Sequence, residues 1–501
     1  MLIDQIYIQA RETPDKPALI VDGQAISYRA FAAVIDRSRS YLAAQGLPAD
    51  AVAVLPTGSN ATVWILLLAL RSLGLTTIVV PSANSIGALG LPEARCVVAV
   101  SGEHPSGLDR VCAAAGLTFI DVPTEIYAGV ADAAVPDLPD HAVLFGGHVL
   151  LTSGTTGAYK KVGLDPSHQP SQMAYRREIF GINQQSVVNI FNLGCWTAGG
   201  HNFAMAAWDA GGAVVIYQQP DLWRSLRTPG ITHCFVFPQL LSGILRAPEG
   251  ELARNDEMRL ISTGGPLSQA LTEAAKARLT SRIYNYLGAT EAGGYTFTPI
   301  EGAEDLRWHR VISSRRVEVV DEESRVMPVG QTGFVRVDLA GGVTGYLHDE
   351  AATRAFFRDG FFYPGDLGMF RADGRLALQG RVTDVINILG QKIASAPIEQ
   401  ALERELGVSG VCVFSAQSET LEEEVQVAIE TEQAIDETRL APVLRRLLPG
   451  APAFRVSFFR ALPRNHMGKV QRIELRRLMA PPPAASGRVA NRSPSSPCDD
   501  V

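Results

Sequence analysis

The sequence has little that would suit the protein to nucleic acid or to a membrane. Its 501 residues carry 45 Lys and Arg against 52 Asp and Glu, a formal net charge of -7. No overall basic field is therefore available to hold polyanions. The most apolar stretch, residues 63–75, is shorter than a bilayer-spanning helix and contains Arg71, so it is interpreted as a buried helix. We expect neither nucleic acid nor a membrane as a partner.

Cysteine is scarce, and its spacing is uninformative for metals. The six cysteines show no CxxC pair, which argues against a structural zinc or iron–sulfur site. Six in so long a chain also make no disulfide framework, which fits a reducing compartment. The N-terminal residues lack the basic and apolar regions of a secretory signal. These features predict a cytoplasmic protein.

The composition is that of a globular chain, with 46% hydrophobic and 19% charged residues. Short apolar runs such as residues 51–55 and 76–80 alternate with helix-like segments, which is typical of α/β layering. After about Pro299 the pattern becomes β-rich. From Thr383 a compact mixed unit follows, with helices expected at residues 396–405 and 437–448.

This organisation predicts an α/β protein in three parts. A large N-terminal domain of several subdomains, residues 1–382, would combine layered sheets and helices with a β-rich subdomain. A small, mobile α+β domain would follow at residues 383–480. Residues 481–501, rich in Pro, Ser and Ala, are expected to be disordered.

A loop of hydroxyls, glycines and lysines follows an apolar strand-like run. Residues 151–162 read LTSGTTGAYKKV. Glycines without Cβ let backbone N–H groups turn toward a ligand, and hydroxyls and an ammonium add donors for a polyphosphate. The GxxxxGK[ST] pattern is absent. Taken alone, the segment is better interpreted as a surface turn between two strands.

The same segment resembles the phosphate loop of the acyl-adenylate-forming superfamily, which includes acid–CoA ligases, adenylation domains and luciferases. Tyr159 stands where that family usually has Pro, and Lys161 where it usually has Gly. The resemblance implies that the phosphates of ATP would be held by Thr152, Ser153, Gly154, Thr155, Thr156, Gly157 and Lys160.

Two further segments resemble the family in the same order. STGGPL, residues 262–267, resembles the turn that lines the adenine and acyl pockets, which implies roles for Gly264 and Gly265. NYLGATE, residues 285–291, resembles the segment in which Thr contacts the α-phosphate and Glu holds Mg²⁺. A hard cation prefers carboxylate and phosphate oxygens, although a helix-start carboxylate is the alternative for the Glu. The resemblance assigns the nucleotide to Asn285, Tyr286 and Leu287. It assigns catalysis to Thr290 and Glu291, and Glu291 is also the expected metal ligand.

Three more segments that resemble the family follow toward the C-terminus. YPGD contains Asp366, which the resemblance assigns to the ribose hydroxyls. GRVTDVINILG contains Arg381 as a nucleotide contact and Thr383 at the hinge, where the family usually has Asp or Lys. PRNHMGKVQR places Lys469 in the slot of the catalytic lysine, which would stabilise charge as the acid attacks phosphorus. The matches run from about Ile26 to Arg472 and cover nearly the whole chain.

The acid pocket is less well specified. Ala198 falls in the slot where amino-acid activators carry Asp, so an amino acid is disfavoured, because its ammonium would be buried unpaired. Trp196 falls in a slot that shields the site in many acid–CoA ligases, with core packing an equal alternative. The residues assigned to the substrate are Trp196, His201, Phe237, Gly288 and Gly293. An apolar or aromatic acid is favoured.

Together these segments predict an acid–CoA ligase that uses ATP, Mg²⁺ and CoA. A carboxylic acid would form acyl-AMP, and the small domain would then rotate about Thr383 to admit the thiol. One alternative is a stand-alone enzyme that loads a carrier-protein phosphopantetheine, which the Asn387 in place of a common lysine motivates. Another is an inert nucleotide-binding relative. The sequence leaves open the acid, the acceptor and the oligomeric state.

Overall fold

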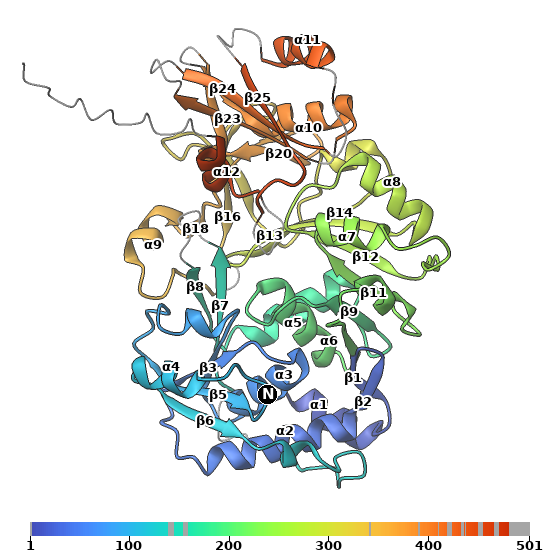
Figure 1. The fold of residues 1–501 in the computed structure, drawn as a ribbon, viewed down its shortest axis with the longest axis vertical. Coiled ribbons are helices and arrows are strands. Elements are labelled where there is room, and N and C mark those ends of the chain that lie inside the picture. Colours follow the sequence, from blue (N-terminus) through green and yellow to red (C-terminus); the bar gives the residue numbers. More distant parts are fainter. Residues whose placement is uncertain are drawn as a thin grey trace, which may run out of the picture. The chain divides into compact units, whose positions relative to one another are not determined.

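The computed structural model of the protein describes residues 3–138, 145–153, 159–339, 342–388, 391–408, 410–417, 423–431, 435, 437–448, 454–464 and 470–479. Its contacts divide the chain into two compact units, residues 1–383 and 384–501, which are described separately (Figure 1). The tail predicted at residues 481–501 lies outside the described residues.

A mainly parallel sheet lies in the N-terminal part of the first unit. Its strands lie in the order β6 (Thr118–Val122), β5 (Ala94–Val100), β3 (Val52–Pro56), β4 (Thr76–Val80), β7 (His148–Ser153) and β8 (Tyr159–Leu164). Pairing is parallel except between β7 and β8, which form an antiparallel hairpin. Residues 154–157 of the predicted phosphate loop fall between these two strands in the sequence and lie outside the described residues.

A second sheet of the same unit is also largely parallel. Its order is β14 (Gly293–Pro299), β13 (Ile283–Ala289), β12 (Arg259–Thr263), β11 (His233–Val236), β9 (Val187–Phe191), β10 (Ala213–Ile216), β1 (Pro17–Val21) and β2 (Gln24–Ser27). The two ends of the sheet are antiparallel pairs. The helices of this part are α1 (Asp4–Glu12), α2 (Tyr28–Ala43), α3 (Asn60–Ser72), α4 (Leu108–Ala114), α5 (Gln169–Phe180), α6 (Ala198–Asp209), α7 (Pro238–Leu245) and α8 (Gln269–Arg278).

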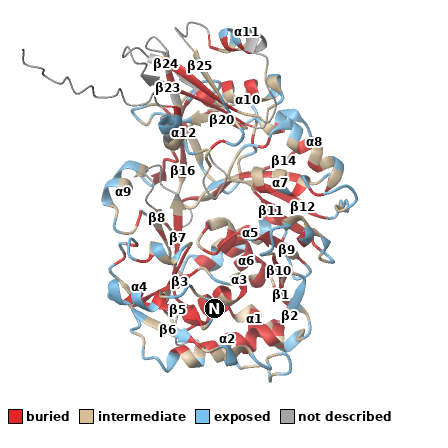
Figure 2. Cartoon of the chain, in the orientation of Figure 1, coloured by how far each residue is buried: buried red, intermediate tan, exposed pale blue. Residues whose placement is uncertain are grey.

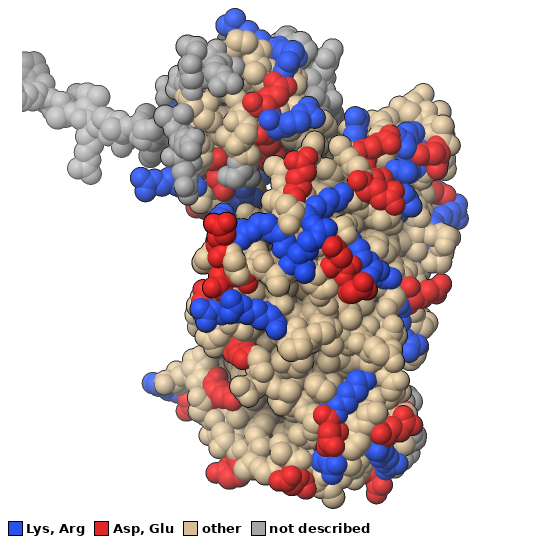
Figure 3. All heavy atoms as spheres, turned by 90° about the vertical axis from the view of Figure 1, so that its right-hand side faces the viewer, with Lys and Arg blue, Asp and Glu red and all other residues tan. Residues whose placement is uncertain are grey.

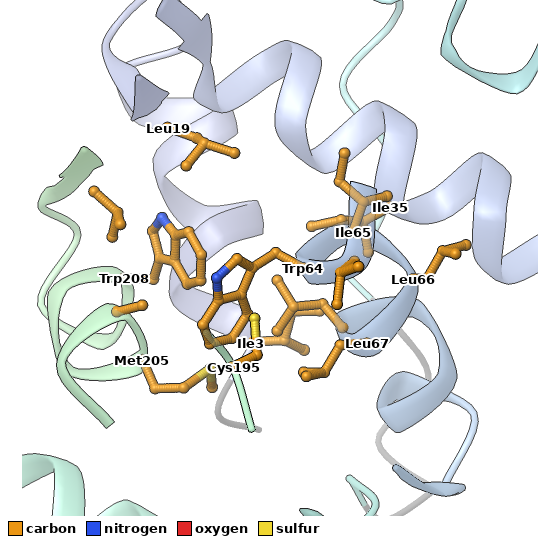
Figure 4. Packing of buried hydrophobic residues seen from close by; sticks show 14 of the residues in the cluster. Ile3, Leu19, Ile35, Trp64, Ile65, Leu66, Leu67, Cys195, Met205 and Trp208 are labelled. Atoms are coloured by element: carbon orange, nitrogen blue, oxygen red, sulfur yellow. The ribbon is translucent and has the colours of Figure 1, made fainter. Parts of the chain in front are cut away.

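The largest core cluster joins these two sheets through helices. Helix α3 is apolar on almost every side and buried along its length, as expected of a helix that solvent does not reach (Figure 2). Its Trp64 meets Trp208 of α6 edge to face, with ring centroids 5.0 Å apart (Figure 4). The indole N–H of Trp208 donates to the carbonyl of Ala18 over 2.8 Å. The buried helix predicted at residues 63–75 is thus confirmed over residues 63–72, and residues 73–75 lie beyond the end of α3.

A β-rich sheet completes the first unit. Its order is β17 (Phe357–Arg358), β18 (Phe361–Phe362), β16 (Gly333–Asp338), β19 (Asp366–Phe370) and β20 (Leu376–Arg381), with β15 (Val317–Val320) also on β16. Helix α9 (Glu350–Phe356) leads into β17. This sheet accounts for the change of pattern that the sequence shows after Pro299.

The second unit is small and mixed. An antiparallel ribbon, β21 (Val385–Ile388) and β22 (Gln391–Ala394), precedes a sheet in the order β23 (Gly410–Gln417), β24 (Glu423–Glu430) and β25 (Phe454–Phe459). Helices α10 (Ser395–Leu406) and α11 (Glu437–Leu447) share one core cluster with the sheet, and α12 (Arg472–Met479) shares another. The predicted fold class, a large α/β N-terminal part and a small α+β C-terminal part, is confirmed.

Within the described ranges, no helix has both the length and the apolar character to cross a bilayer. Basic and acidic side chains are interspersed on the face that Figure 3 shows. Ion pairs of the first unit include Arg371 with Asp373.

Candidate functional site

The candidate site in the first unit begins at one edge of the second sheet. Strands β9, β11, β12 and β13 run parallel, so the residues that follow them gather at their carboxyl ends, where ligands bind in open α/β sheets. These residues include Phe237 after β11, Gly264 and Gly265 after β12, and Gly288 near the end of β13. The structure therefore brings together residues that the sequence placed in separate motifs.

Two buried polar side chains at this edge lie in register. Asn285 of β13 pairs with Ser262 of β12, and both are almost completely buried. Neither Asn285 Oδ1 nor Ser262 Oγ has a hydrogen-bond partner within the described part of the chain. A buried acceptor without a partner is costly, so Asn285 fits a site that a polar ligand completes, as expected for a nucleotide base.

Tyr286 and Leu287 point to different surroundings because neighbours on a strand alternate in direction. The Tyr286 ring is 7% exposed and meets Phe180 edge to face at 5.0 Å. It lies where a Cβ on Gly294 would come within 2.1 Å, so glycine is required there. Leu287 is only partly buried, and of the two it is the one left partly exposed at this edge.

The β13–β14 hairpin turn carries the predicted catalytic pair. Thr290 and Glu291 lie in the turn between these strands. Glu291 is 8% exposed, and its Oε1 accepts a 2.7 Å hydrogen bond from the hydroxyl of Tyr346. Burial and the carboxylate of Glu291 raise the pKa of Tyr346 above its usual range, so the phenol remains a donor at neutral pH.

Arg315 fixes the backbone of the same turn. Its Nη1 donates to the carbonyls of Ala292 and Gly294 over 2.8 and 2.7 Å. Its Nε donates to Asp338 Oδ1 over 2.9 Å. Gly293, between the two carbonyls, has a φ of 72°, which favours glycine. Hydrogen bonds from Arg315 to its backbone carbonyls therefore hold the turn that carries Glu291.

Lys160 approaches the same tyrosine from the β7–β8 hairpin. Thr152 pairs with Lys160 across that hairpin. The Lys160 ammonium lies 4.8 Å from the ring centroid of Tyr346 and 3.7 Å from that of Phe356. Burial lowers the pKa of Lys160, and the charge of Glu291 partly opposes that shift. Strand β7 includes Ser153, whereas Gly154, Thr155, Thr156 and Gly157 lie outside the described residues.

Asp366 and Arg381 form an ion pair on adjacent strands. They are register partners on β19 and β20, and Arg381 Nε lies 2.8 Å from Asp366 Oδ1. The charge of Arg381 also lowers the pKa of Tyr346, against the larger raising effects of burial and of Glu291. The pair presents a carboxylate and a guanidinium side by side on the β-rich sheet.

The two predicted pocket residues of the α6 region have different surroundings. Trp196 is partly buried and its ring covers Gly194, where a Cβ would lie 1.8 Å from it. His201 is completely buried, and its Nε2 lies 3.2 Å from Arg71 Nη1. His148 stacks on it at 4.3 Å. All described contacts of His201 are with core side chains.

Arg71, Tyr346 and Arg315 have roles that the sequence analysis did not identify. Arg71 is fully buried and donates from Nε to the carbonyl of Gly146 over 2.9 Å and from Nη2 to Gln169. In the sequence, the signal for these buried contacts of Arg71 is the presence of an arginine inside an apolar helix.

In the second unit, the structure describes the ion pairs of Arg472 but not the predicted catalytic lysine. Lys469 lies outside the described residues. Arg472, three positions later, lies 3.0 Å from Asp384 Oδ2 and 2.8 Å from Glu399 Oε1. Asp384 directly follows Thr383, so this ion pair links the start of α12 to the first residue of the unit.

A metal ion in the first unit would depend on the nucleotide. Within the described ranges, no group of three or more His, Cys, Asp or Glu side chains could enclose an ion. Mg²⁺ commonly takes one or two carboxylates together with substrate phosphates. The buried Glu291, whose Oε1 accepts from the hydroxyl of Tyr346, fits that arrangement.

Comparisons with known proteins cover most of the chain. The profile of the AMP-binding enzyme family matches residues 6–347. The fatty acid–[acyl-carrier-protein] ligase ScoC of Streptomyces coeruleorubidus is 28% identical, over 95% of this chain and 96% of that protein. The sulfoacetate–CoA ligase of Cupriavidus necator is 27% identical, over 94% and 96%. The match to tyrocidine synthase 3 of Brevibacillus parabrevis, at 26% identity, covers 7% of that protein.

Solved structures show the same fold. ATP-bound MatB from Rhodopseudomonas palustris superposes with a TM-score of 0.80 at 23% identity, over 95% of this chain and 98% of MatB. The resemblance to the acyl-adenylate-forming superfamily is therefore confirmed, and this chain belongs to the AMP-binding enzyme family.

Proposed function

We propose that the protein joins a carboxylic acid to a thiol in two steps, with ATP as the source of energy. First, a carboxylate oxygen attacks the α-phosphorus of ATP, the bond from that phosphorus to the bridging oxygen breaks, and pyrophosphate leaves. Second, a thiolate sulfur attacks the carbonyl carbon of the acyl-AMP, the carbon–oxygen bond breaks, and AMP leaves. The first step is the one to which most of the residues named above are assigned.

The observation that carries the proposal is the clustering of charged groups around the Glu291 turn. The hydroxyl of Tyr346 donates to Glu291, its ring lies 4.8 Å from the ammonium of Lys160, and the β-rich sheet adds the Asp366–Arg381 ion pair. They come from a hairpin of one sheet, a hairpin of another and the β-rich sheet. A nucleoside triphosphate requires such a mixed set, with donors for its phosphates and acceptors for its hydroxyls.

The residues of the first unit divide between the parts of ATP. Asn285 and the Gly264–Gly265 turn would face the base, Asp366 the ribose hydroxyls, and Thr290 the α-phosphate. Lys160, Thr152 and the loop at residues 153–157 would hold the remaining phosphates. Mg²⁺, when bound with ATP at Glu291, would neutralise phosphate charge.

Lys469 would act from the second unit. Its ammonium would stabilise the negative charge that develops as the acid oxygen meets phosphorus. Rotation of the unit about Thr383 would then withdraw it and admit the thiol, a common device for completing and releasing a site. The Arg472–Asp384 pair supports this, because it ties the helix after Lys469 to the proposed hinge.

The acid is proposed to be apolar or aromatic rather than an amino acid. The first turn of α6 begins at Ala198 and contains no acidic residue, so an α-ammonium would find no charged partner there. Trp196 and Phe237 are both partly buried near the carboxyl ends of β9 and β11. Their large apolar faces suit a substrate that lacks charge beyond its carboxylate.

The thiol is proposed to be free CoA, with a carrier-protein phosphopantetheine as the second candidate. The second candidate has a specific basis, because one relative of matching length is named as an acyl-carrier-protein ligase and another as a CoA ligase. Both thiols share the same reacting group. They differ in the surface that must be recognised beyond the pantetheine arm.

The test is pyrophosphate release over a panel of aromatic, aliphatic and amino acids with ATP and Mg²⁺. We expect release with aromatic or aliphatic acids and a marked decrease in Glu291→Gln. Asp373→Asn, which changes an exposed carboxylate between β19 and β20 of the β-rich sheet, should behave as the wild type. Supplying CoA or a phosphopantetheinylated carrier protein then identifies the acceptor by thioester formation. Absence of release across the panel would favour an inert relative.

A further inference from the structure

We propose that Tyr346 is a positioning residue for Glu291, holding in one orientation the carboxylate that would bind Mg²⁺. The inference rests on the proposed function, because it concerns the nucleotide and metal site of that reaction. Tyr346 lies 55 residues beyond Glu291 and outside every motif that the sequence analysis used.

The hydrogen bond has the geometry of a strong orienting contact. The Tyr346 hydroxyl donates to Glu291 Oε1 over 2.7 Å, and both side chains are buried. A hydrogen bond to a charged acceptor is about twice as strong as one between neutral groups. With Oε1 held in this way, the carboxylate cannot rotate freely, and Oε2 is left in a defined direction.

The tyrosine itself is fixed from several sides. Its backbone N–H donates to Thr353 Oγ1 of α9 over 2.9 Å. Its ring meets that of Phe357 edge to face at 5.3 Å and packs with Val162 and Val343. The hydroxyl is thus presented to Glu291 by a ring that packing already holds, which makes it a preorganised donor.

The ring and the hydroxyl of Tyr346 serve different neighbours. The ring faces the ammonium of Lys160 at 4.8 Å, whereas the hydroxyl binds Glu291. Tyr346→Phe therefore removes the contact with Glu291 and keeps the ring under Lys160. This separation allows a metal effect to be distinguished from a phosphate effect.

Loss of the Tyr346 hydroxyl should weaken the contribution of Mg²⁺ to ATP affinity and leave ATP binding without metal unchanged. Partners that orient a metal-binding side chain typically account for about 10- to 100-fold in metal affinity or activity. We expect Tyr346→Phe to decrease the gain in ATP affinity that Mg²⁺ provides by about 10-fold or more. ATP affinity in EDTA should stay at the wild-type value.

Calorimetric titration of the full-length protein with ATP, in EDTA and in excess Mg²⁺, measures this gain directly. The proteins compared are the wild type, Tyr346→Phe, Glu291→Gln and the double variant. If the hydroxyl acts through Glu291, Tyr346→Phe should have little further effect once Glu291→Gln is present. A general structural defect would instead lower ATP affinity in EDTA and in both backgrounds.

Tyr363→Phe is the matched control. Tyr363 is also buried in this part of the unit, and its hydroxyl accepts from Arg336 over 3.2 Å instead of binding Glu291. It should keep the wild-type gain from Mg²⁺, and thermal unfolding of both variants reports the cost of losing a buried hydroxyl.

Two results would overturn the inference. A wild-type gain from Mg²⁺ in Tyr346→Phe, with the gain lost in Glu291→Gln, would remove the role of Tyr346 and leave the proposed function intact. Failure of the wild type to bind ATP in either condition would instead remove the proposed function, and this inference with it.

Discussion

Asp366 and Arg381 face each other across neighbouring strands, with Arg381 Nε 2.8 Å from Asp366 Oδ1. The Asp366 side chain is largely buried, whereas that of Arg381 is about half exposed. Arg381 also donates to the carbonyl of Pro364 over 2.7 Å. The carboxylate is therefore held in place by a cation on one side, and a carboxylate so placed is a natural acceptor for a pair of hydroxyls.

Asp366→Asn should weaken ATP binding through the ribose. A hydrogen bond to a charged group contributes about 1.5–3 kcal/mol, so affinity should fall roughly 10- to 100-fold. Calorimetric titration with ATP measures the loss. Repeating it with 2′,3′-dideoxy-ATP provides the decisive comparison, because the variant and the wild type should then bind almost equally. An equal loss with both nucleotides would contradict the assignment to the ribose.

Lys469→Ala should separate the two half-reactions. Removing one preorganised donor at the site of developing charge lowers the rate by about 10²-fold or more, so pyrophosphate exchange should fall by that factor. Thioester formation from supplied acyl-AMP should be largely retained, because the lysine would have withdrawn by then. Lys276→Ala is the control, at a partly exposed lysine of α8 that donates to the carbonyl of Glu301 over 3.1 Å. Unchanged pyrophosphate exchange in Lys469→Ala would refute its role.

Buried histidines should make the first unit sensitive to acid. Burial lowers the pKa of His148 to about 3 and that of His233 and His309 to about 4 each. In the unfolded chain a histidine has a pKa near 6.5, so below that value the unfolded state binds more protons than the folded state. The free energy of unfolding should therefore be constant above about pH 6.5 and fall as the pH decreases toward 4.

Urea unfolding at several pH values between 7 and 4.5 tests this dependence. His233→Gln removes one of the groups, so the slope of stability against pH should decrease by up to about 1.4 kcal/mol per pH unit. His168→Gln, at an exposed histidine, is the comparison variant. The assignment fails if the two variants have the same slope.

Much of the fold could be predicted because its elements carry local patterns. The run at residues 76–80 is β4 with the same bounds, and the run at residues 51–55 differs from β3 by one residue at each end. The helices expected at residues 396–405 and 437–448 lie within about two residues of α10 and α11. Alternation, apolar periodicity and helix formers are properties of neighbouring residues, so they are visible in a single sequence.

The surroundings of individual side chains could not be predicted in this way. The partners of Glu291 and His201 come from residues 55 and 130 positions away. The motif around Tyr286 and Leu287 identified the segment, but only the fold shows that Tyr286 packs against Gly294 and Phe180. Contacts between distant segments depend on how the sheets pack, and local patterns contain no record of that packing.

The most direct test of the account follows one oxygen atom. Carboxylic acid labelled with ¹⁸O in both carboxylate oxygens is incubated with the protein, ATP, Mg²⁺ and the thiol, and the products are examined by mass spectrometry. Attack of the carboxylate on the α-phosphorus predicts one ¹⁸O in AMP and none in pyrophosphate. Unlabelled AMP, or label in inorganic phosphate or pyrophosphate, would contradict activation of the acid as acyl-AMP.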